Sequence, residues 1–247
     1  MERVSLIFLH SLLMLFSWLT LATTDQIKSD ESSLLALKSR ITSDPDNYLK
    51  NNWTIGTSIC TWIGVTCDSR DSRVTALDLS YMGLEGSIPP EIGNLSFLVS
   101  LDLSLNSLCG PLPKDICRHN NLQRLEALYL FSNKLEGEIP LSLGECPQLE
   151  FINLSYNNFG GHVPSQIGNI TQLKALDLSW NNQRGTIPKE IGNLHNLRYM
   201  KLESNQLIGS IPREVGNMTA LFELQLRNNS LSGMIYYSPS HKFSYSS

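Results

Sequence analysis

Apolar residues recur along most of this chain at a fixed spacing, which predicts a stack of similar structural units. The segment LKALDLSWNNQRGTIPKEIGNLHN, from Leu173 to Asn196, is one copy. The step between copies is 24 residues, except that the second unit carries three more between Arg118 and Arg124. Because each unit would contact its neighbours, we expect one continuous array rather than separate domains. The copies begin at Val74, Leu98, Leu125, Leu149, Leu173, Leu197 and Leu221.

The first, fourth and sixth positions of a unit are apolar, as at Leu173, Leu176 and Leu178. Because alternate side chains of a strand point to opposite faces, this stretch predicts a short strand with an inward apolar face. The period and the pattern L-x-x-L-x-L-x-x-N-x-L are typical of leucine-rich repeats. We therefore predict an α/β repeat fold, a right-handed solenoid with a parallel β-sheet on its concave side and a disulfide-closed N-terminal cap.

Two polar features accompany the apolar pattern. A G-x-[ILV]-P motif, Gly86 to Pro89 in the first unit, predicts a turn that begins the convex side, because glycine and proline favour special backbone torsions. The ninth position of the first unit is Met82 instead of asparagine, and the eleventh position of the fifth unit is Gln183 instead of an apolar residue. A ninth-position amide can donate to and accept from main-chain groups left open where the chain turns inward. That amide belongs to Asn106, Asn133, Asn157, Asn181, Asn205 and Asn229.

The first 24 residues predict a secretory signal peptide. Arg3 is followed by a mostly apolar stretch from Val4 to Leu21 and by small residues at Ala22 and Thr24. A transmembrane anchor is the alternative, but polar residues interrupt the stretch too often for a long apolar span. With no later run of ~20 apolar residues, we expect the mature chain to be soluble and secreted, in the extracellular space.

Residues 25–73 are expected to form the N-terminal cap of the array, which would otherwise expose an apolar edge. Ser29 to Ile41 has apolar residues at helical spacing after a polar start, which predicts a helix. Cys60 and Cys67 are expected to form a disulfide, since an exported chain meets an oxidising compartment. A metal site is the weaker alternative, because no Cys or His cluster completes it.

The other three cysteines leave their pairing open. Cys146 occupies a position held by Leu95 and Ile170 in other units, so we expect a buried free thiol there. Cys109 and Cys117 lie in one unit and could pair, but the sequence alone does not decide this.

Composition and motifs give no sign of catalysis. The chain has 247 residues, a formal net charge of -4 and a pI of about 5.7, so nothing favours nucleic acid or acidic membranes. The sequence contains no kinase, hydrolase or Walker motif and no metal-binding motif. Asp78, Asp102 and Asp177 recur at the fifth position, and we interpret them as part of a solvated sheet face. We expect no enzymatic activity, cofactor or metal in this chain.

The most variable positions predict where a ligand would bind. Positions three, five, seven and eight should face solvent on or beside the strands. Exposed aromatic residues contribute strongly to interfaces, although single surface aromatics are common and could be unrelated. The predicted contact strip consists of Tyr129, Phe131, Phe151, Tyr156, Asp177, Trp180, Tyr199, Lys201 and Glu203.

N-x-[ST] sequons predict surface glycosylation in an exported chain. Three of them share one repeat position, so the motif could instead reflect the repeat consensus. Asn153 falls within the contact strip, where a glycan would compete with a ligand. The predicted glycosylation sites are Asn52, Asn94, Asn153, Asn169, Asn217 and Asn228.

The block C-T-W-I-G-V-T-C, Cys60 to Cys67, precedes repeats of the form L-D-L-S-x-N-x-L-x-G-x-I-P-x-x-I-G-N-L. Over residues 29–235 this arrangement resembles the ectodomains of plant leucine-rich-repeat receptor-like kinases and receptor-like proteins. The resemblance implies an extracellular module that binds a peptide or a co-receptor ectodomain in signalling or defence. A full-length receptor would lie at the plasma membrane, and its kinase activity would belong to a domain that this sequence does not contain.

Two departures from that family keep alternatives open. The seven repeats, assigned to residues 74–235, end where Tyr236 replaces the expected proline, and residues 236–247 form an irregular tail without a second cysteine cap. One alternative is a secreted protein similar to plant polygalacturonase inhibitors, although those have more repeats and a second cap. The other is a truncated product with little function.

Overall fold

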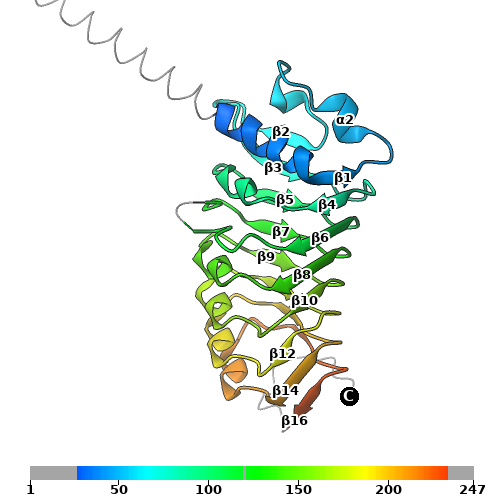
Figure 1. The fold of residues 1–247 in the computed structure, drawn as a ribbon. Helices are drawn as coiled ribbons and strands as arrows, with labels where there is room; N and C mark the ends of the chain where they lie inside the picture. Colours follow the sequence, from blue (N-terminus) through cyan, green and yellow to red (C-terminus); the bar gives the residue numbers. More distant parts are fainter. Residues whose placement is uncertain (1–26, 119–120, 233–247) are drawn as a thin grey trace, which may run out of the picture.

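The computed structural model describes residues 27–118 and 121–232, which stack unit upon unit into one elongated solenoid (Figure 1). The predicted signal peptide at 1–24 and the tail at 236–247 lie outside the described residues. Within those residues, no helix is both long enough and apolar enough to span a bilayer. The predicted right-handed leucine-rich-repeat solenoid is confirmed.

The concave face carries an eight-stranded sheet, with one strand from each of the seven repeats and one strand, β2, from the cap. Its neighbours are parallel throughout, except that β2 from the cap pairs antiparallel with β3. The predicted inward positions are buried, as shown by Leu173, Leu176 and Leu178. The strands are β2 (Val65–Cys67), β3 (Val74–Asp78), β5 (Ser100–Asp102), β7 (Ala127–Tyr129), β9 (Phe151–Asn153), β11 (Ala175–Asp177), β13 (Tyr199–Lys201) and β15 (Glu223–Gln225).

A second set of strands, which the sequence pattern did not predict, consists of β1 from the cap and one strand after the turn that ends the concave strand of each repeat. It divides into a five-stranded and a three-stranded sheet at the fifth repeat. There the buried Gln183 replaces the usual apolar residue, and its Nε2 donates to the carbonyl oxygen of Gly160 at 2.7 Å. The strands are β1 (Ile41–Ser43), β4 (Glu85–Ser87), β6 (Ser107–Pro111), β8 (Lys134–Glu138) and β10 (Asn158–Gly160), then β12 (Arg184–Gly185), β14 (Gln206–Ser210) and β16 (Ser230–Ser232).

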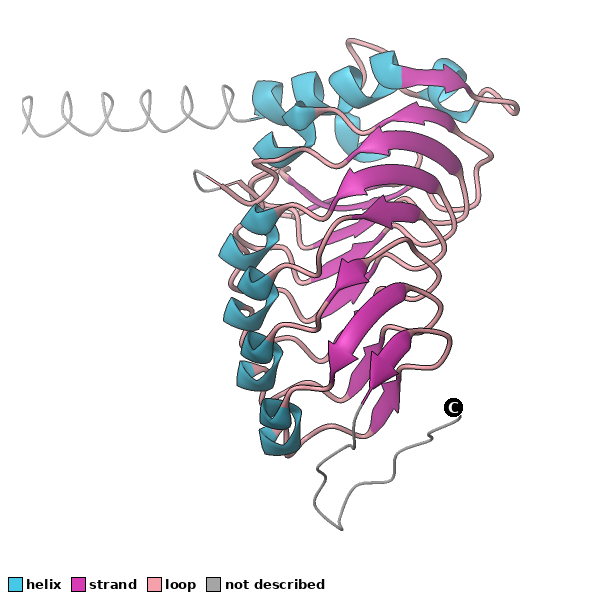
Figure 2. Ribbon diagram, turned by 60° about the horizontal axis from the view of Figure 1, so that its bottom comes forward, coloured by secondary structure: helices cyan, strands magenta, loops and turns pink. Residues whose placement is uncertain are grey.

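Short 3-10 helices cover the convex side in a regular column (Figure 2). Their I-G-N glycine is required by close stacking, because a Cβ at Gly168 would lie 2.3 Å from the carbonyl oxygen of Glu190. The helices begin in the residues that follow the G-x-[ILV]-P turn, where that motif predicted the convex side. They are η2 (Pro90–Asn94), η3 (Leu141–Glu145), η4 (Ser165–Asn169), η5 (Lys189–Asn193) and η6 (Arg213–Asn217).

The ninth-position asparagines bind main-chain groups at the turn, as predicted, and some of these groups belong to the preceding repeat. The Oδ1 of Asn157 accepts from the backbone N–H of Leu135 at 3.0 Å, in the preceding repeat. Its Nδ2 donates to the carbonyl oxygens of Leu130, Leu154 and Ser155 at 2.9, 3.2 and 3.1 Å. The buried amide therefore satisfies four main-chain groups at the point where the strand ends.

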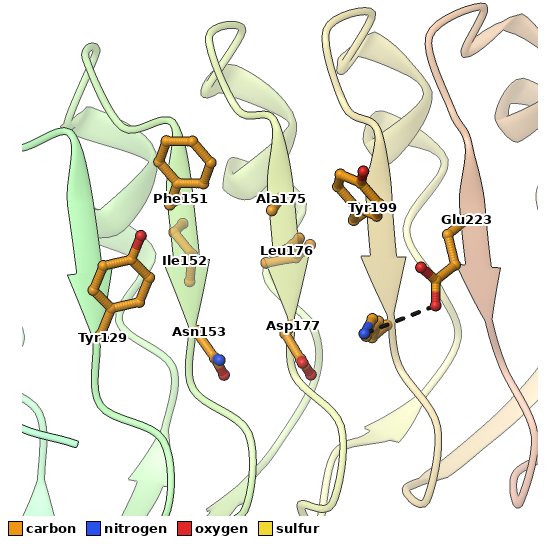
Figure 3. Close-up of a pocket in the computed structure, with 10 residues that line it drawn as sticks. Tyr129, Phe151, Ile152, Asn153, Ala175, Leu176, Asp177, Tyr199 and Glu223 are labelled. Carbon is orange, nitrogen blue, oxygen red and sulfur yellow. Dashed lines mark ion pairs between the residues drawn. The ribbon is translucent and has the colours of Figure 1, made fainter. Parts of the chain in front are cut away.

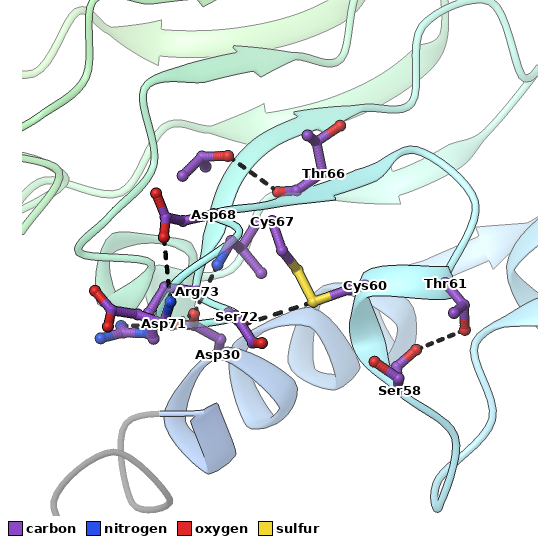
Figure 4. The surroundings of a disulfide bond; sticks show 12 residues. Asp30, Ser58, Cys60, Thr61, Thr66, Cys67, Asp68, Asp71, Ser72 and Arg73 are labelled. Atoms are coloured by element: carbon purple, nitrogen blue, oxygen red, sulfur yellow. Dashed lines mark hydrogen bonds and ion pairs between the residues drawn. A yellow bond between two sulfur atoms is a disulfide. The ribbon is translucent and has the colours of Figure 1, made fainter. Parts of the chain in front are cut away.

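The N-terminal cap is tied to the first repeat by a disulfide-closed segment and a buried ion pair (Figure 4). Residues 27–40 form a helix, followed by α2 (Tyr48–Asn52) and η1 (Ile59–Thr61). The predicted Cys60–Cys67 disulfide is present. Asp30 accepts from Arg73 Nε at 2.8 Å and from the Val74 backbone N–H at 3.0 Å, so the cap helix contacts the first repeat directly.

The prediction of a free thiol at Cys146 is wrong, and the structure decides the pairing that the sequence left open for Cys109 and Cys117. Cys146 is not a free thiol and Cys109 does not pair with Cys117; instead Cys117 and Cys146 form a disulfide across two repeats, with their Cα atoms 5.3 Å apart. The solenoid places these two convex-side positions above one another, which their 29-residue separation in sequence conceals. Cys109 lies on β6, where it is exposed and free.

Candidate functional site

Outward side chains of the concave sheet lie in two rows, because each three-residue strand presents its first and last residues on the same face. In the first row, Ala175 pairs in register with Phe151 on one side and with Tyr199 on the other. The residues between the rows, Ile152 and Leu176, are buried and form the floor (Figure 3). The strands thus place one aromatic ring on each side of the Ala175 methyl group.

A hollow of about 260 Å³ lies over these strands. Ala175 creates it, since a methyl group cannot fill the space between the side chains of Phe151 and Tyr199 (Figure 3). We call this hollow and its two rows of side chains the concave groove. It is lined by Tyr129, Phe151, Ile152, Asn153, Ala175, Leu176, Asp177, Tyr199, Lys201 and Glu223.

The second row of the concave groove is polar and held by local hydrogen bonds. Asp177 Oδ1 accepts from the backbone N–H of Ser179 at 3.0 Å, and Asn153 Oδ1 accepts from that of Ser155 at 3.1 Å. These bonds fix both side chains at the strand ends, in agreement with the interpretation of the aspartates as part of the sheet face.

Tyr129 extends the polar row toward the N-terminal repeats, in register with Asp102. Burial raises the pKa of the Tyr129 phenol above its ordinary value of 10.0, and the nearby carboxylate of Asp102 raises it further. Tyr129 therefore presents a neutral hydroxyl to the groove at physiological pH.

Two ion pairs lie along the groove, one between its last two strands, β13 and β15, and one beside its middle strands, β9 and β11. Lys201 Nζ lies 3.8 Å from Glu223 Oε1, and Lys174 Nζ lies 2.6 Å from Glu150 Oε2 (Figure 3 shows the first pair). Both pairs are partly exposed, so they add little to the stability of the fold and mainly determine the distribution of charge along the groove.

The seventh position is buried in the second, fourth, fifth and sixth repeats, contrary to the prediction, whereas Arg227 at the seventh position of the last repeat is exposed. Ser155, Ser179 and Glu203 are buried, because the chain turns toward the interior after the strand. The Glu203 carboxylate instead accepts from Arg227 Nε at 2.8 Å, which compensates its burial. Phe131, also at the seventh position, is half-buried and does not line the concave groove.

The predicted aromatic strip is divided into two groups. Tyr156 and Trp180 lie beyond the strand ends, where they stack with ring centroids 5.4 Å apart and planes 8° apart. Both are exposed, and they line a different hollow from the one between Phe151 and Tyr199. The structure therefore brings together Tyr129, Phe151, Asp177, Tyr199 and Lys201, and separates Tyr156 and Trp180 from them.

Sequence reasoning missed the second position of each repeat. Phe222 is exposed and contacts Tyr199 edge-on, with ring centroids 6.0 Å apart. Arg198 lies 6.0 Å from the centroid of the Tyr199 ring, and Lys174 lies 5.9 Å from that of Phe151. The sequence could have indicated this position, because its residues change in charge and size from repeat to repeat. Glu223 and the small Ala175 were missed as well.

Most predicted glycosylation sites lie on accessible surface. Asn52, Asn94, Asn169, Asn217 and Asn228 are exposed, whereas Asn153 is half-buried in the concave groove. Whether any of them carries a glycan stays a prediction.

Family models cover most of the described chain. The leucine rich repeat N-terminal domain matches residues 27–68. The leucine rich repeat model matches six stretches, at 73–95, 97–119, 124–146, 148–170, 172–194 and 196–218.

Known proteins similar to this chain are plant receptors. The Arabidopsis thaliana LRR receptor-like serine/threonine-protein kinase GSO2 is 42% identical over 125 residues, which make up 50% of this chain but only 10% of that kinase. The Arabidopsis receptor kinase HAESA, solved with the peptide hormone IDA and the co-receptor SERK1, has 33% identity and a TM-score of 0.65, with 82% of this chain and 38% of that chain covered.

A shorter ectodomain is similar over nearly its whole length. The BIR2 ectodomain from Arabidopsis thaliana has 28% identity and a TM-score of 0.59, with 83% of this chain and 94% of that chain covered. The described solenoid is thus comparable in extent to that ectodomain, while it spans only a small part of the long kinases.

Proposed function

The chain belongs to the leucine-rich-repeat family of plant receptor-like kinase ectodomains, and on that premise we propose that its concave groove binds an extended peptide. The observation that carries the proposal is the hollow over Ala175, between Phe151 and Tyr199. It combines an apolar floor and aromatic sides with polar groups at its edge, the usual composition of a specific binding site.

The dimensions of the hollow suit one apolar side chain of a peptide. Phe151 and Tyr199 lie two strands apart, about 10 Å between their backbones. After the thickness of the rings, this leaves room for an aliphatic or proline side chain. Burial of one such side chain contributes about 1.5–3 kcal/mol. Ala175 would determine specificity by leaving that space open.

The polar row and the ion pairs would fix the direction of the peptide. Asp177 and Tyr129 offer an anionic and a neutral oxygen to the peptide N–H groups or basic side chains. Lys201 and Glu223 lie toward the C-terminal repeats and offer both signs of charge. This asymmetry favours one orientation of the bound chain over the other.

On this proposal, the chain is an extracellular recognition module that takes part in signalling or defence and has no catalytic activity of its own. HAESA was solved with a peptide hormone and a co-receptor together. By analogy, a co-receptor ectodomain is the second partner of this chain, and a membrane-anchored form would lie at the cell surface.

The test is selection of peptides against the chain, produced through a secretory pathway, from a displayed random library of peptides about a dozen residues long. Selected peptides are expected to share an apolar residue and to lose about 10- to 100-fold in affinity for the variants Phe151→Ala and Tyr199→Ala. Tyr81→Ala, an exposed aromatic in the first repeat, serves as the matched control. Equal affinity for Phe151→Ala, Tyr199→Ala and the unaltered chain would reject the proposal.

A further inference from the structure

The eighth position of every repeat has left-handed backbone geometry, with φ between 53° and 56°. Such torsions are unfavourable for bulky residues and are tolerated best by glycine, asparagine and aspartate. Two neighbouring repeats nevertheless place large aromatic residues there, Tyr156 and Trp180, both exposed to solvent. Neither conformational preference nor core packing explains these aromatic residues. The eighth-position residues are Tyr81, Leu105, Ser132, Tyr156, Trp180, Ser204 and Asn228.

Small residues flank the aromatic stack at both ends. The next repeat places Ser204 beside Trp180, and the preceding repeat places Ser132 beside Tyr156. A hollow of about 360 Å³ lies along this edge, which we call the edge hollow. Both stacked rings and Ser204 of the following repeat line this hollow. Its lining consists of Asn133, Tyr156, Asn157, Asn158, Trp180, Asn181, Asn182 and Ser204.

The chemistry of the edge hollow differs from that of the concave groove. None of its lining residues is charged, and the exposed amides of Asn158 and Asn182 can both donate and accept hydrogen bonds. A sugar ring offers hydroxyl groups that also donate and accept, together with an apolar C–H face that fits against an aromatic ring. We propose that the edge hollow binds a neutral saccharide stacked on Trp180.

One source of this saccharide is the chain itself. Asn228 occupies the eighth position of the last repeat, within an N-x-S sequon that ends at Ser230. Its Nδ2, the atom to which an N-linked glycan attaches, lies 3.2 Å from the Oγ of Ser204. The first sugar would therefore begin beside Ser204, which lines the edge hollow together with Trp180. A free neutral oligosaccharide would have the same chemistry, and the two sources are separated experimentally.

Tryptophan fluorescence reports on this site directly. Trp53 and Trp62 are buried in the cap, whereas Trp180 is 45% exposed. Iodide, which does not enter the core, should therefore quench mainly Trp180 among the tryptophans that the structure describes. The chain is produced in a glycosylating host, Asn228 occupancy is measured by mass spectrometry, and quenching is compared with that of Asn228→Gln and Ser230→Ala. Two variants are used because they remove the same sequon through different residues.

If the glycan occupies the edge hollow, both variants show stronger quenching of Trp180 than the glycosylated chain. Cellohexaose and chitotetraose then protect Trp180 in the variants but not in the glycosylated chain. If the source is a free saccharide, quenching is equal in all three forms and one of the two saccharides protects Trp180 in each. Because Trp180→Ala removes the fluorescent reporter, saccharide binding to this variant is measured by isothermal titration; it should be abolished, whereas the matched control Tyr81→Ala should preserve it.

Equal quenching in all forms, together with no effect of either saccharide, would overturn the proposal. The result is independent of the concave groove, because peptide affinity is not part of the measurement.

Discussion

The two faces of the concave sheet differ although they belong to the same short strands. The inward residues, such as Ile152 and Leu176, repeat one chemistry in every unit and are buried. Their outward neighbours change from repeat to repeat, from Phe151 to Ala175 to Tyr199. The comparison teaches that stability is shared among many equivalent positions, whereas recognition depends on a few single substitutions. Variants of each face should therefore separate the two properties.

The largest effect on stability is expected inside the turn, at Asn181→Ala. Its Oδ1 accepts from the backbone N–H of Phe159 at 3.0 Å, and its Nδ2 donates to three carbonyl oxygens. Loss of the amide leaves buried main-chain groups unsatisfied and should lower the free energy of unfolding by about 3–5 kcal/mol. Urea denaturation measures the change. The exposed neighbour Asn182→Ala is the control, and an equal effect there would contradict the asparagine-ladder interpretation.

The convex disulfide ranks next. Cys146→Ser removes the bond to Cys117 and should lower the free energy of unfolding by about 2–4 kcal/mol, because the unfolded chain gains freedom. The exposed free thiol provides the matched control, since Cys109→Ser should change stability by less than about 0.5 kcal/mol. Thermal unfolding of both variants under non-reducing conditions checks the difference. Similar unfolding of the two would argue against the Cys117–Cys146 pair.

Substitution of an outward residue should change binding more than stability. Lys201 and Glu223 form a partly exposed ion pair, so Lys201→Ala should change the free energy of unfolding by less than about 1 kcal/mol. Peptides selected on the unaltered chain should nevertheless bind this variant with a weaker dependence on ionic strength. Titrations at low and high salt test this, and a destabilised variant with unchanged salt dependence would reverse our assignment of the two faces.

The smallest expected effect concerns alkaline pH. The pKa of Tyr129 is raised in the folded chain by burial and by Asp102. Its contribution to stability is therefore fully present below its unfolded pKa and is lost as pH rises through the folded value. Denaturation above and below about pH 10 should show a slightly smaller loss for Tyr129→Phe than for the unaltered chain. An identical pH dependence of Tyr129→Phe and the unaltered chain would contradict the raised pKa of Tyr129 that we attribute to burial and Asp102.

Much of the fold was predictable because it follows from repetition. The period placed the strands and the asparagine ladder, and the cap disulfide followed from two nearby cysteines in an exported chain. The second set of strands was not predicted, since strands such as β6 and β8 pair through main-chain groups and require little of their side chains. The Cys117–Cys146 bond was missed because it depends on how one repeat sits upon the next.

The candidate site was predictable only in part, for a related reason. Alternation along a strand correctly placed Tyr129, Phe151 and Tyr199 on the open face. It could not show that the turn buries Glu203, nor that an alanine produces the hollow. A search for aromatic residues finds the sides of a groove but not the space between them, which here depends on Ala175.

The most direct test of the central claim fills that space. Ala175→Leu extends a branched side chain into the concave groove, whereas Ala76→Leu makes the same change at the third position of the first repeat, away from the hollow. Isothermal titration of a peptide selected on the unaltered chain should show at least about a tenfold loss of affinity for Ala175→Leu and none for Ala76→Leu. Undiminished binding to a correctly folded Ala175→Leu variant would contradict the account.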